Sequence, residues 1–265
     1  MKLFYRKIGE GKPIIILHGL FGQSDNWNSF AKQFKESGYA IYLVDVRNHG
    51  HSPHSDSWNY QVMSDDVYEL INDNDLTKDG KIILIGHSMG GKIAMQFTIN
   101  YPELLYKLIV VDIGPKHYPP HHQEILKALN SVDLPLLKTR KDADVILSKY
   151  INDVGTKQFL LKNLYWTDGT KESAVGNIGF NWRFNLKIIS SKIDNVGEAI
   201  AEGISSNTST LLIKGSKSNY ILNEDATFIK STFPNSVIET INDAGHWVHA
   251  EKPKELYERM MNFIN

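Results

Sequence analysis

The chain has 265 residues, which is long enough to bury one large core, and its formal net charge is −1. The charge is balanced and there is no run of basic residues, so the chain lacks the basic patch typical of nucleic-acid-binding proteins. The charge also gives no reason to expect an anionic membrane as partner. The absence of cysteine excludes a thiol nucleophile, a disulfide framework and a cysteine-based zinc site, and we expect a cytosolic protein because no apolar stretch is typical of a signal peptide or a membrane span.

Short apolar runs rich in β-branched residues alternate with longer amphipathic stretches along the chain. The runs predict strands at Ile14–Leu17, Ala40–Val44, Lys81–Ile85, Lys107–Val111, Thr210–Ile213 and Ser236–Ile241. The stretches predict helices at Asp25–Ser37, Tyr60–Asn72, Met89–Asn100, Asn223–Phe233 and Lys254–Phe263. Strands that alternate with helices of this length predict an α/β fold with βαβ units and a mostly parallel sheet.

One segment interrupts the alternation. From about Pro115 to Ile189 there is no clear strand, and helical pieces are separated by polar breaks such as NDVGTK and TDGTKESAVGN. A bare loop of this length is implausible in a compact domain, so we expect a helical cap over residues 115–189, inserted between core strands. The core then comprises residues 1–114 and 190–265.

The third predicted strand runs into Gly86-His87-Ser88-Met89-Gly90, which is followed by a helix. This is the G-x-S-x-G nucleophile elbow in the strand–turn–helix context that it requires. The glycines let the backbone make a sharp turn, which leaves the serine hydroxyl exposed above the sheet. The turn also sets the Met89 amide at a helix N-terminus, where it favours a developing oxyanion. We therefore expect Ser88 to be a catalytic nucleophile.

A serine hydroxyl needs a general base, because at its free pKa it is a weak nucleophile. The sequence Asp243-Ala244-Gly245-His246-Trp247 follows the last predicted strand, which is where this fold carries its base. His246 is therefore the expected base, and Trp247 beside it is expected to form a wall of the pocket. A second oxyanion donor should come from the loop His18-Gly19-Leu20-Phe21-Gly22, with the Leu20 amide favoured over that of Phe21.

The acid that orients the base is less obvious. Many hydrolases of this fold carry it after the strand that follows the cap, but Gly215-Ser216-Lys217-Ser218-Asn219 contains no carboxylate. Glu224 and Asp225 come later, inside a predicted helix. Asp112 ends a core strand, where a buried carboxylate is costly unless it is hydrogen-bonded, and where α/β sheets place their sites.

Several motifs together resemble the YbfF-type esterases of the α/β-hydrolase superfamily: HGLFG at 18–22, DVRNHGHSPH at 45–54, GHSMGGK at 86–92, VVDIGP at 110–115, NWRFN at 181–185 and AGHWVHAEKP at 244–253. The resemblance covers nearly the whole core, and only residues 116–180 carry no motif that supports it. It implies an α/β-hydrolase fold and a serine esterase acting on short-to-medium acyl esters and acyl-CoA thioesters, with small molecules as its partners. It also implies that the acid follows the strand after the elbow helix, which selects Asp112.

Two alternatives remain open at this stage. His49-Gly50-His51-Ser52-Pro53-His54 resembles the H-x-H-x-D-H zinc motif, but Pro53 replaces the aspartate ligand, so no metal or cofactor is expected. The same fold also supports C–C cleavage or elimination, as in menaquinone biosynthesis, because a serine–histidine pair can act as a base alone. Haloalkane or epoxide chemistry is less favoured, because those enzymes carry an aspartate at the position that Ser88 occupies. A noncatalytic binding role is less favoured, because every catalytic position holds a competent residue.

Two residues near the end of the expected cap, Trp182 and Arg183, are candidates for substrate contact. Arg183 lies between Trp182 and Phe184 in NWRFN, where its guanidinium is suited to a carboxylate or phosphate on the substrate. The alternative is an arginine packed over aromatic rings to hold the cap on the core.

Overall fold

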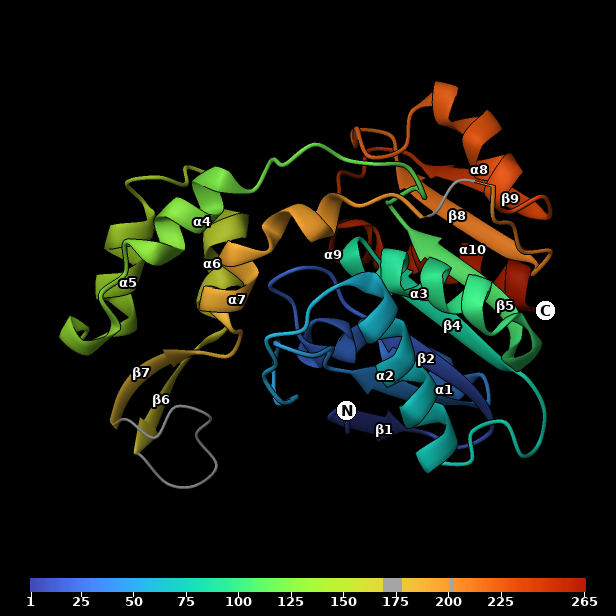
Figure 1. Ribbon diagram of the computed structural model, residues 1–265, viewed down its shortest axis with the longest axis horizontal. Helices are drawn as coiled ribbons and strands as arrows, with labels where there is room; N and C mark the ends of the chain where they lie inside the picture. The colour runs from blue at the N-terminus through green and yellow to red at the C-terminus, as the bar shows by residue number, and fades with distance from the viewer. Residues whose placement is uncertain (169–177, 201–202) are drawn as a thin grey trace.

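The centre of the molecule is a mixed sheet with helices on both faces, seen in a computed structural model that describes residues 1–168, 178–200 and 203–265 (Figure 1). Within these residues the sheet has seven strands in the order β1-β3-β2-β4-β5-β8-β9, and only β1 runs antiparallel to its neighbour. The strands are β1 (Tyr5–Ile8), β2 (Lys12–Leu17), β3 (Tyr39–Val44), β4 (Ile82–His87), β5 (Leu105–Val111), β8 (Thr210–Gly215) and β9 (Ser236–Ile241).

The six strands expected from the sequence are present, and their ends differ from the expected ones by at most two residues. β1 was not predicted, because its sequence YRKI has two adjacent charged residues and lacks the apolar run of a central strand, as suits its place at an edge of the sheet.

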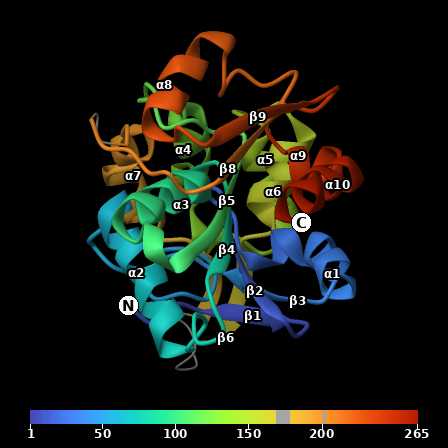
Figure 2. The ribbon, with the colours of Figure 1, turned by 90° about the vertical axis from the view of Figure 1, so that its right-hand side faces the viewer.

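Alternation of side chains along each strand divides the core between the two faces of the sheet. Ile15 and Leu17 of β2 point into one apolar cluster, whereas Ile14 and Ile16 point into the other. Figure 2 shows α2 and α3 on one side of the sheet and α1 and α10 on the other. The core helices are α1 (Asn28–Glu36), α2 (Tyr60–Asp73), α3 (Met89–Asn100), α8 (Ala226–Thr232), α9 (Val248–Glu251) and α10 (Pro253–Ile264).

Between β5 and β8 the chain leaves the sheet and forms a separate layer beside it, drawn from green to orange in Figure 1. This segment contains α4 (Gln123–Asn130), α5 (Arg140–Leu147), α6 (Val154–Leu161), β6 (Leu164–Asp168), β7 (Ile178–Trp182) and α7 (Leu186–Ser191). We propose that residues 115–189 form the cap; the proposed boundary falls within α7.

The expectation that this segment has no strand was wrong. β6 and β7 pair antiparallel, with Leu164 opposite Trp182, and form a two-stranded sheet of their own. Each strand is short and carries polar residues, so neither shows the apolar run used to predict the core strands. Most of the polar break TDGTKESAVGN lies outside the described residues.

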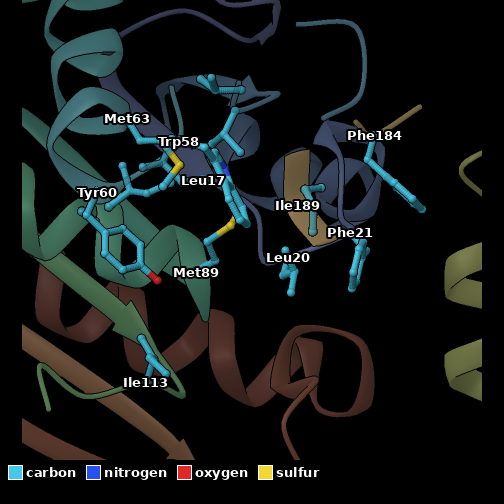
Figure 3. Close-up of a cluster of buried hydrophobic side chains, with 14 of the residues drawn as sticks. Leu17, Leu20, Phe21, Trp58, Tyr60, Met63, Met89, Ile113, Phe184 and Ile189 are labelled. Carbon is cyan, nitrogen blue, oxygen red and sulfur yellow. The ribbon is translucent and has the colours of Figure 1, made fainter. Parts of the chain in front are cut away.

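One core cluster continues from the sheet into the cap segment. Figure 3 shows Leu20 and Phe21 from the loop after β2 close to Phe184 and Ile189, with Met89 to their left. The rings of Phe21 and Phe184 meet edge to face with centroids 5.0 Å apart. This apolar contact fixes the loop after β2 against the end of the proposed cap segment. No helix in the described ranges combines the length and apolar character needed to cross a membrane.

Candidate active site

Ser88 lies on a sharp turn between β4 and α3. Its φ of 52° and ψ of −121° are unusual for a residue with a side chain, and the surrounding packing holds this conformation. A Cβ on Gly86 would lie 2.2 Å from the Gly90 carbonyl oxygen, and one on Gly90 would lie 2.4 Å from that of Leu17. The turn therefore requires both glycines, and it exposes the Ser88 hydroxyl at the carboxyl edge of the sheet.

His246 follows β9 and lies with its ring edge toward this serine. Its Nε2 is 3.0 Å from Ser88 Oγ, which is within hydrogen-bonding distance. Glu251 of α9 accepts a hydrogen bond from the Gly245 amide (2.9 Å) and so fixes the loop that carries the histidine. The arrangement allows the imidazole to take the hydroxyl proton directly.

Asp112 follows β5 and is fully buried. Its Oδ2 lies 2.7 Å from His246 Nδ1 and accepts a hydrogen bond from Ser218 Oγ at 2.5 Å, while Oδ1 accepts one from the Gly215 amide at 3.0 Å. Three donors around one carboxylate stabilise its charge without a cationic side chain. The Asp112 carboxylate therefore fixes the His246 tautomer that leaves Nε2 free to accept a proton.

The other acidic candidates lie elsewhere. Asp225 pairs with Lys116 at 2.6 Å and accepts a hydrogen bond from the Leu222 amide, and Glu224 precedes it in a short 3₁₀ turn. The structure thus brings Asp112 to His246 and does not bring Glu224 or Asp225 there.

The amides expected to bind an oxyanion differ in their present hydrogen bonding. The Phe21 amide donates to His49 Nε2 at 3.2 Å, so it is already engaged. In the described part of the chain no hydrogen bond is found for the amides of Leu20 and Met89. Leu20 also lines the cavity around Ser88. This geometry favours Leu20 over Phe21 as the partner of Met89, in the order expected from the sequence.

Two buried histidines hold the loop after β2 in place. His18 Nε2 accepts from the Val46 amide (3.1 Å) and His49 Nε2 from the Phe21 amide (3.2 Å). The Nδ1 of each ring lies beside a backbone carbonyl, at 2.8 and 3.0 Å, so each ring carries its proton on Nδ1. Burial lowers the pKa of both, that of His49 to about 3. Both rings are therefore neutral and structural.

The histidines of the motif at 49–54 do not converge. His49 is engaged as described, and His51 Nδ1 lies 3.4 Å from the Arg183 guanidinium. Among the described residues no group of three or more acidic or histidine side chains is arranged to hold a metal ion.

Cavity walls come from both the core and the cap segment. A cavity of about 170 Å³ lies over Ser88 and His246, with walls that are mainly apolar. Its lining includes Leu20, Ile125, Phe159, Leu160, Tyr220 and Trp247. Trp247 thus lies where it was expected.

Trp182 and Arg183 do not line this cavity. Trp182 stacks on Phe184 with ring centroids 5.3 Å apart, and the Arg183 guanidinium lies 4.2 Å from the ring centroid of Tyr165. The arginine is therefore packed over an aromatic ring, as in the alternative considered from the sequence, but that ring belongs to β6 of the cap segment and not to the core.

Lys92, one turn along α3 from Ser88, is completely buried. Its Nζ donates to the carbonyls of Pro115 (3.2 Å), Lys116 (2.5 Å) and Glu198 (2.8 Å), on the two connections between the sheet and the cap segment. Burial lowers the pKa of the lysine to about 7. Lys92 therefore fastens both connections to the helix that follows Ser88.

Sequence reasoning missed the two residues of the loop after β8 that act on the histidine–aspartate pair. Ser218 binds Asp112, and the Tyr220 ring stacks on the His246 ring with centroids 4.0 Å apart. The prediction for this loop concerned a carboxylate alone. The signal that was available is its place at the carboxyl end of a core strand, where hydroxyl and aromatic groups also reach the site.

Comparisons with known proteins agree with this geometry. The family model described as alpha/beta hydrolase fold matches residues 12–144. The chain is 34% identical to the esterase YbfF of Escherichia coli, with 96% of this chain and 93% of the relative covered. It is 35% identical to the sn-1-specific diacylglycerol lipase ABHD11 of Mus musculus, over 95% of this chain and 80% of the relative. The solved structure titled "Marine microorganism esterase" matches with a TM-score of 0.92 and 40% identity, covering 99% of both chains.

Proposed function

The chain belongs to the α/β-hydrolase fold family, and within it to the YbfF-type esterases, and it is a carboxylic ester hydrolase; we propose that it acts through an acyl-enzyme on Ser88. The observation that carries this proposal is the unbroken hydrogen-bonded series of Ser88, His246 and Asp112, with distances of 3.0 and 2.7 Å. Its Ser–His–acid arrangement has the geometry of serine hydrolase triads.

The first half of the reaction forms the acyl-enzyme. Ser88 Oγ attacks the ester carbonyl carbon while His246 Nε2 takes the hydroxyl proton, and Asp112 stabilises the resulting imidazolium. The carbonyl oxygen becomes an oxyanion that the Leu20 and Met89 amides bind. The imidazolium then gives its proton to the leaving alcohol as the carbon–oxygen bond breaks.

The second half of the reaction hydrolyses the acyl-enzyme and regenerates the free enzyme. Water attacks the acyl-enzyme with His246 again taking a proton, and the collapse of the second tetrahedral intermediate releases the acid and restores the Ser88 hydroxyl. No cofactor enters this sequence of steps, and the partner we propose is a small-molecule ester or thioester in the cytosol.

Cavity size supports the substrate class. A closed apolar cavity of about 150 Å³ holds a molecule as large as benzene, and the cavity here has about 170 Å³ with apolar walls. We therefore place the acyl group in the short-to-medium range. Phe159 and Leu160 of α6 line the cavity from the cap segment, and we propose that they set the limit on chain length.

Labelling of the nucleophile tests the proposal. A fluorophosphonate probe should label the wild type at Ser88 alone, and Ser88→Ala should abolish p-nitrophenyl ester hydrolysis while the thermal unfolding curve is unchanged. EDTA should leave the wild-type rate unchanged. Full activity of the variant, or labelling of another serine, would overturn the assignment, and elimination without hydrolysis would favour the lyase alternative.

A panel of p-nitrophenyl esters and acyl-CoAs of graded chain length tests the substrate class. Leu160→Ala enlarges the cavity and should move the preferred acyl chain upward by a few carbons. Leu136→Ala, a change at an exposed position of the cap segment, is the matched control and should leave the preference unchanged. No turnover of any acyl ester would refute the proposal.

A further inference from the structure

The imidazole of His246 is stacked on one face by an aromatic ring as well as bound at its edges. Tyr220 lies over one side with a centroid distance of 4.0 Å and an interplanar angle of 20°. The His87 ring is also close, at 4.8 Å, but is tilted by 41°. Ser88 and Asp112 bind the two ring nitrogens. Tyr220 is therefore the aromatic side chain that stacks on the proposed base.

Tyr220 is fixed in this position at both ends. Its carbonyl accepts a hydrogen bond from the Tyr118 hydroxyl at 2.6 Å, and that hydroxyl in turn accepts one from the Gly114 amide at 2.8 Å. Its own hydroxyl lies 2.6 Å from His121 Nε2. Because His121 Nδ1 lies beside the Pro119 carbonyl at 2.9 Å and donates to it, Nε2 is the acceptor and the tyrosine hydroxyl donates.

Burial raises the pKa of Tyr220 to about 12, so its ring is that of a neutral phenol throughout the working range of the enzyme. A neutral phenol face carries the negative side of the ring quadrupole and attracts a cation held over it. Stacking on neutral imidazole lacks this attraction. The contact is therefore stronger for the imidazolium than for the imidazole.

We infer that Tyr220 is a positioning residue that stabilises the imidazolium of His246 as Ser88 attacks, and this inference rests on the proposed function. The imidazolium forms only as the proton leaves the serine, so the contact lowers the barrier more than it strengthens substrate binding. The loop after β8 thus contributes to the site without a carboxylate. Ser218 donates a hydrogen bond to Asp112, which binds the edge of the imidazole, and Tyr220 acts from its face.

The histidines that face His246 do not change charge in the pH range of the assay, so the acid limb of the pH profile of kcat/KM can be interpreted. His87, His122 and His249 face His246 from β4, the cap connection and α9, and burial holds the pKa of each well below its usual value, to about 3 for the last two. These three stay neutral between pH 5 and 9. Asp112 binds the edge of the His246 ring, and His121 is connected to the site by its hydrogen bond with the Tyr220 hydroxyl.

The test compares Tyr220→Phe with Tyr220→Leu, using kcat/KM for p-nitrophenyl acetate between pH 5 and 9. Tyr220→Phe keeps the ring and should stay within about threefold of the wild type, with the same acid limb. Tyr220→Leu should lower the plateau by about threefold to 30-fold, the range of a partly desolvated cation–π contact. Its acid limb should move to lower pH, because the imidazolium has lost its partner.

Phe159→Leu is the matched control, because it removes another aromatic ring of the cavity wall that packs on Trp247. It should alter KM and leave the acid limb in place. An unshifted limb in Tyr220→Leu, or an equal loss in Tyr220→Phe, would overturn the inference. Thermal unfolding of each variant separates these outcomes from misfolding. Failure of Ser88 labelling in the wild type would instead refute the proposed function.

Discussion

Replacing Asp112 by asparagine changes one oxygen of a carboxylate that only accepts hydrogen bonds into an NH₂ group that only donates. The Gly215 amide that points at Oδ1 belongs to the backbone and cannot turn away. The NH₂ group must therefore take the place of Oδ2, where it meets Ser218 and His246. The serine hydroxyl can rotate to accept, but the histidine can accept on Nδ1 only by moving its proton to Nε2.

A proton on Nε2 blocks the reaction, because the histidine can then no longer take the proton of Ser88. The same exchange in serine proteases lowers kcat by about four orders of magnitude, through the same wrong tautomer. That factor corresponds to about 5.5 kcal/mol of lost transition-state stabilisation. We expect a loss of three to four orders of magnitude in Asp112→Asn, with KM changed much less.

The assay is hydrolysis of p-nitrophenyl acetate, with thermal unfolding to show that the variant is folded. Ser218→Ala is the companion variant. It removes one donor to Asp112 but leaves the His246 tautomer intact, so its kcat should fall by no more than about tenfold. If Asp112→Asn keeps more than a tenth of the wild-type kcat, then Asp112 is not the group that sets the tautomer of the base.

Three further predictions concern the turn, the cap connections and the rejected acids. Gly90→Ala forces a Cβ to within 2.4 Å of the Leu17 carbonyl, so it should cost about 1–3 kcal/mol of stability in thermal unfolding and most of the activity; a fully active, equally stable variant contradicts this. Burial lowers the pKa of Lys92 from the 10.5 of an ordinary lysine to about 7 in the folded protein, so between these values the unfolded chain binds more protons and stability rises with pH. The free energy of unfolding of the wild type, relative to that of Lys92→Met, should therefore increase by up to about 1.4 kcal/mol per pH unit above pH 7. A difference that does not change with pH would refute the lowered pKa of Lys92. Glu224→Gln and Asp225→Asn should each keep kcat within a few-fold of the wild type, because neither side chain lies at the base; a loss approaching that of the triad variants would show otherwise.

Local patterns in the sequence determined the core strands and the sharp turn at Ser88. A strand, a turn with two glycines and a helix are close together in the chain, and their physical requirements apply to any sequence that folds this way. The same holds for the position of His246 after the last strand. Such features could be predicted because each depends on residues that are near neighbours in the sequence.

Asp112 could be singled out from the sequence as the candidate acid only by combining a missing carboxylate at 215–219 with a resemblance to a known family. Asp112 and His246 are 134 residues apart, and their contact depends on β5 and β9 lying on either side of β8. No local pattern specifies that order of strands.

Only the tertiary structure decided which side chains line the cavity. It packs Trp182 against Phe184 and Arg183 over Tyr165, away from Ser88, although the sequence made the first of each pair a candidate for substrate contact. It also forms the β6–β7 hairpin and brings Tyr220 onto the face of His246. These outcomes depend on packing between segments distant in the chain, whereas periodicity reports only how each segment is divided between buried and exposed sides.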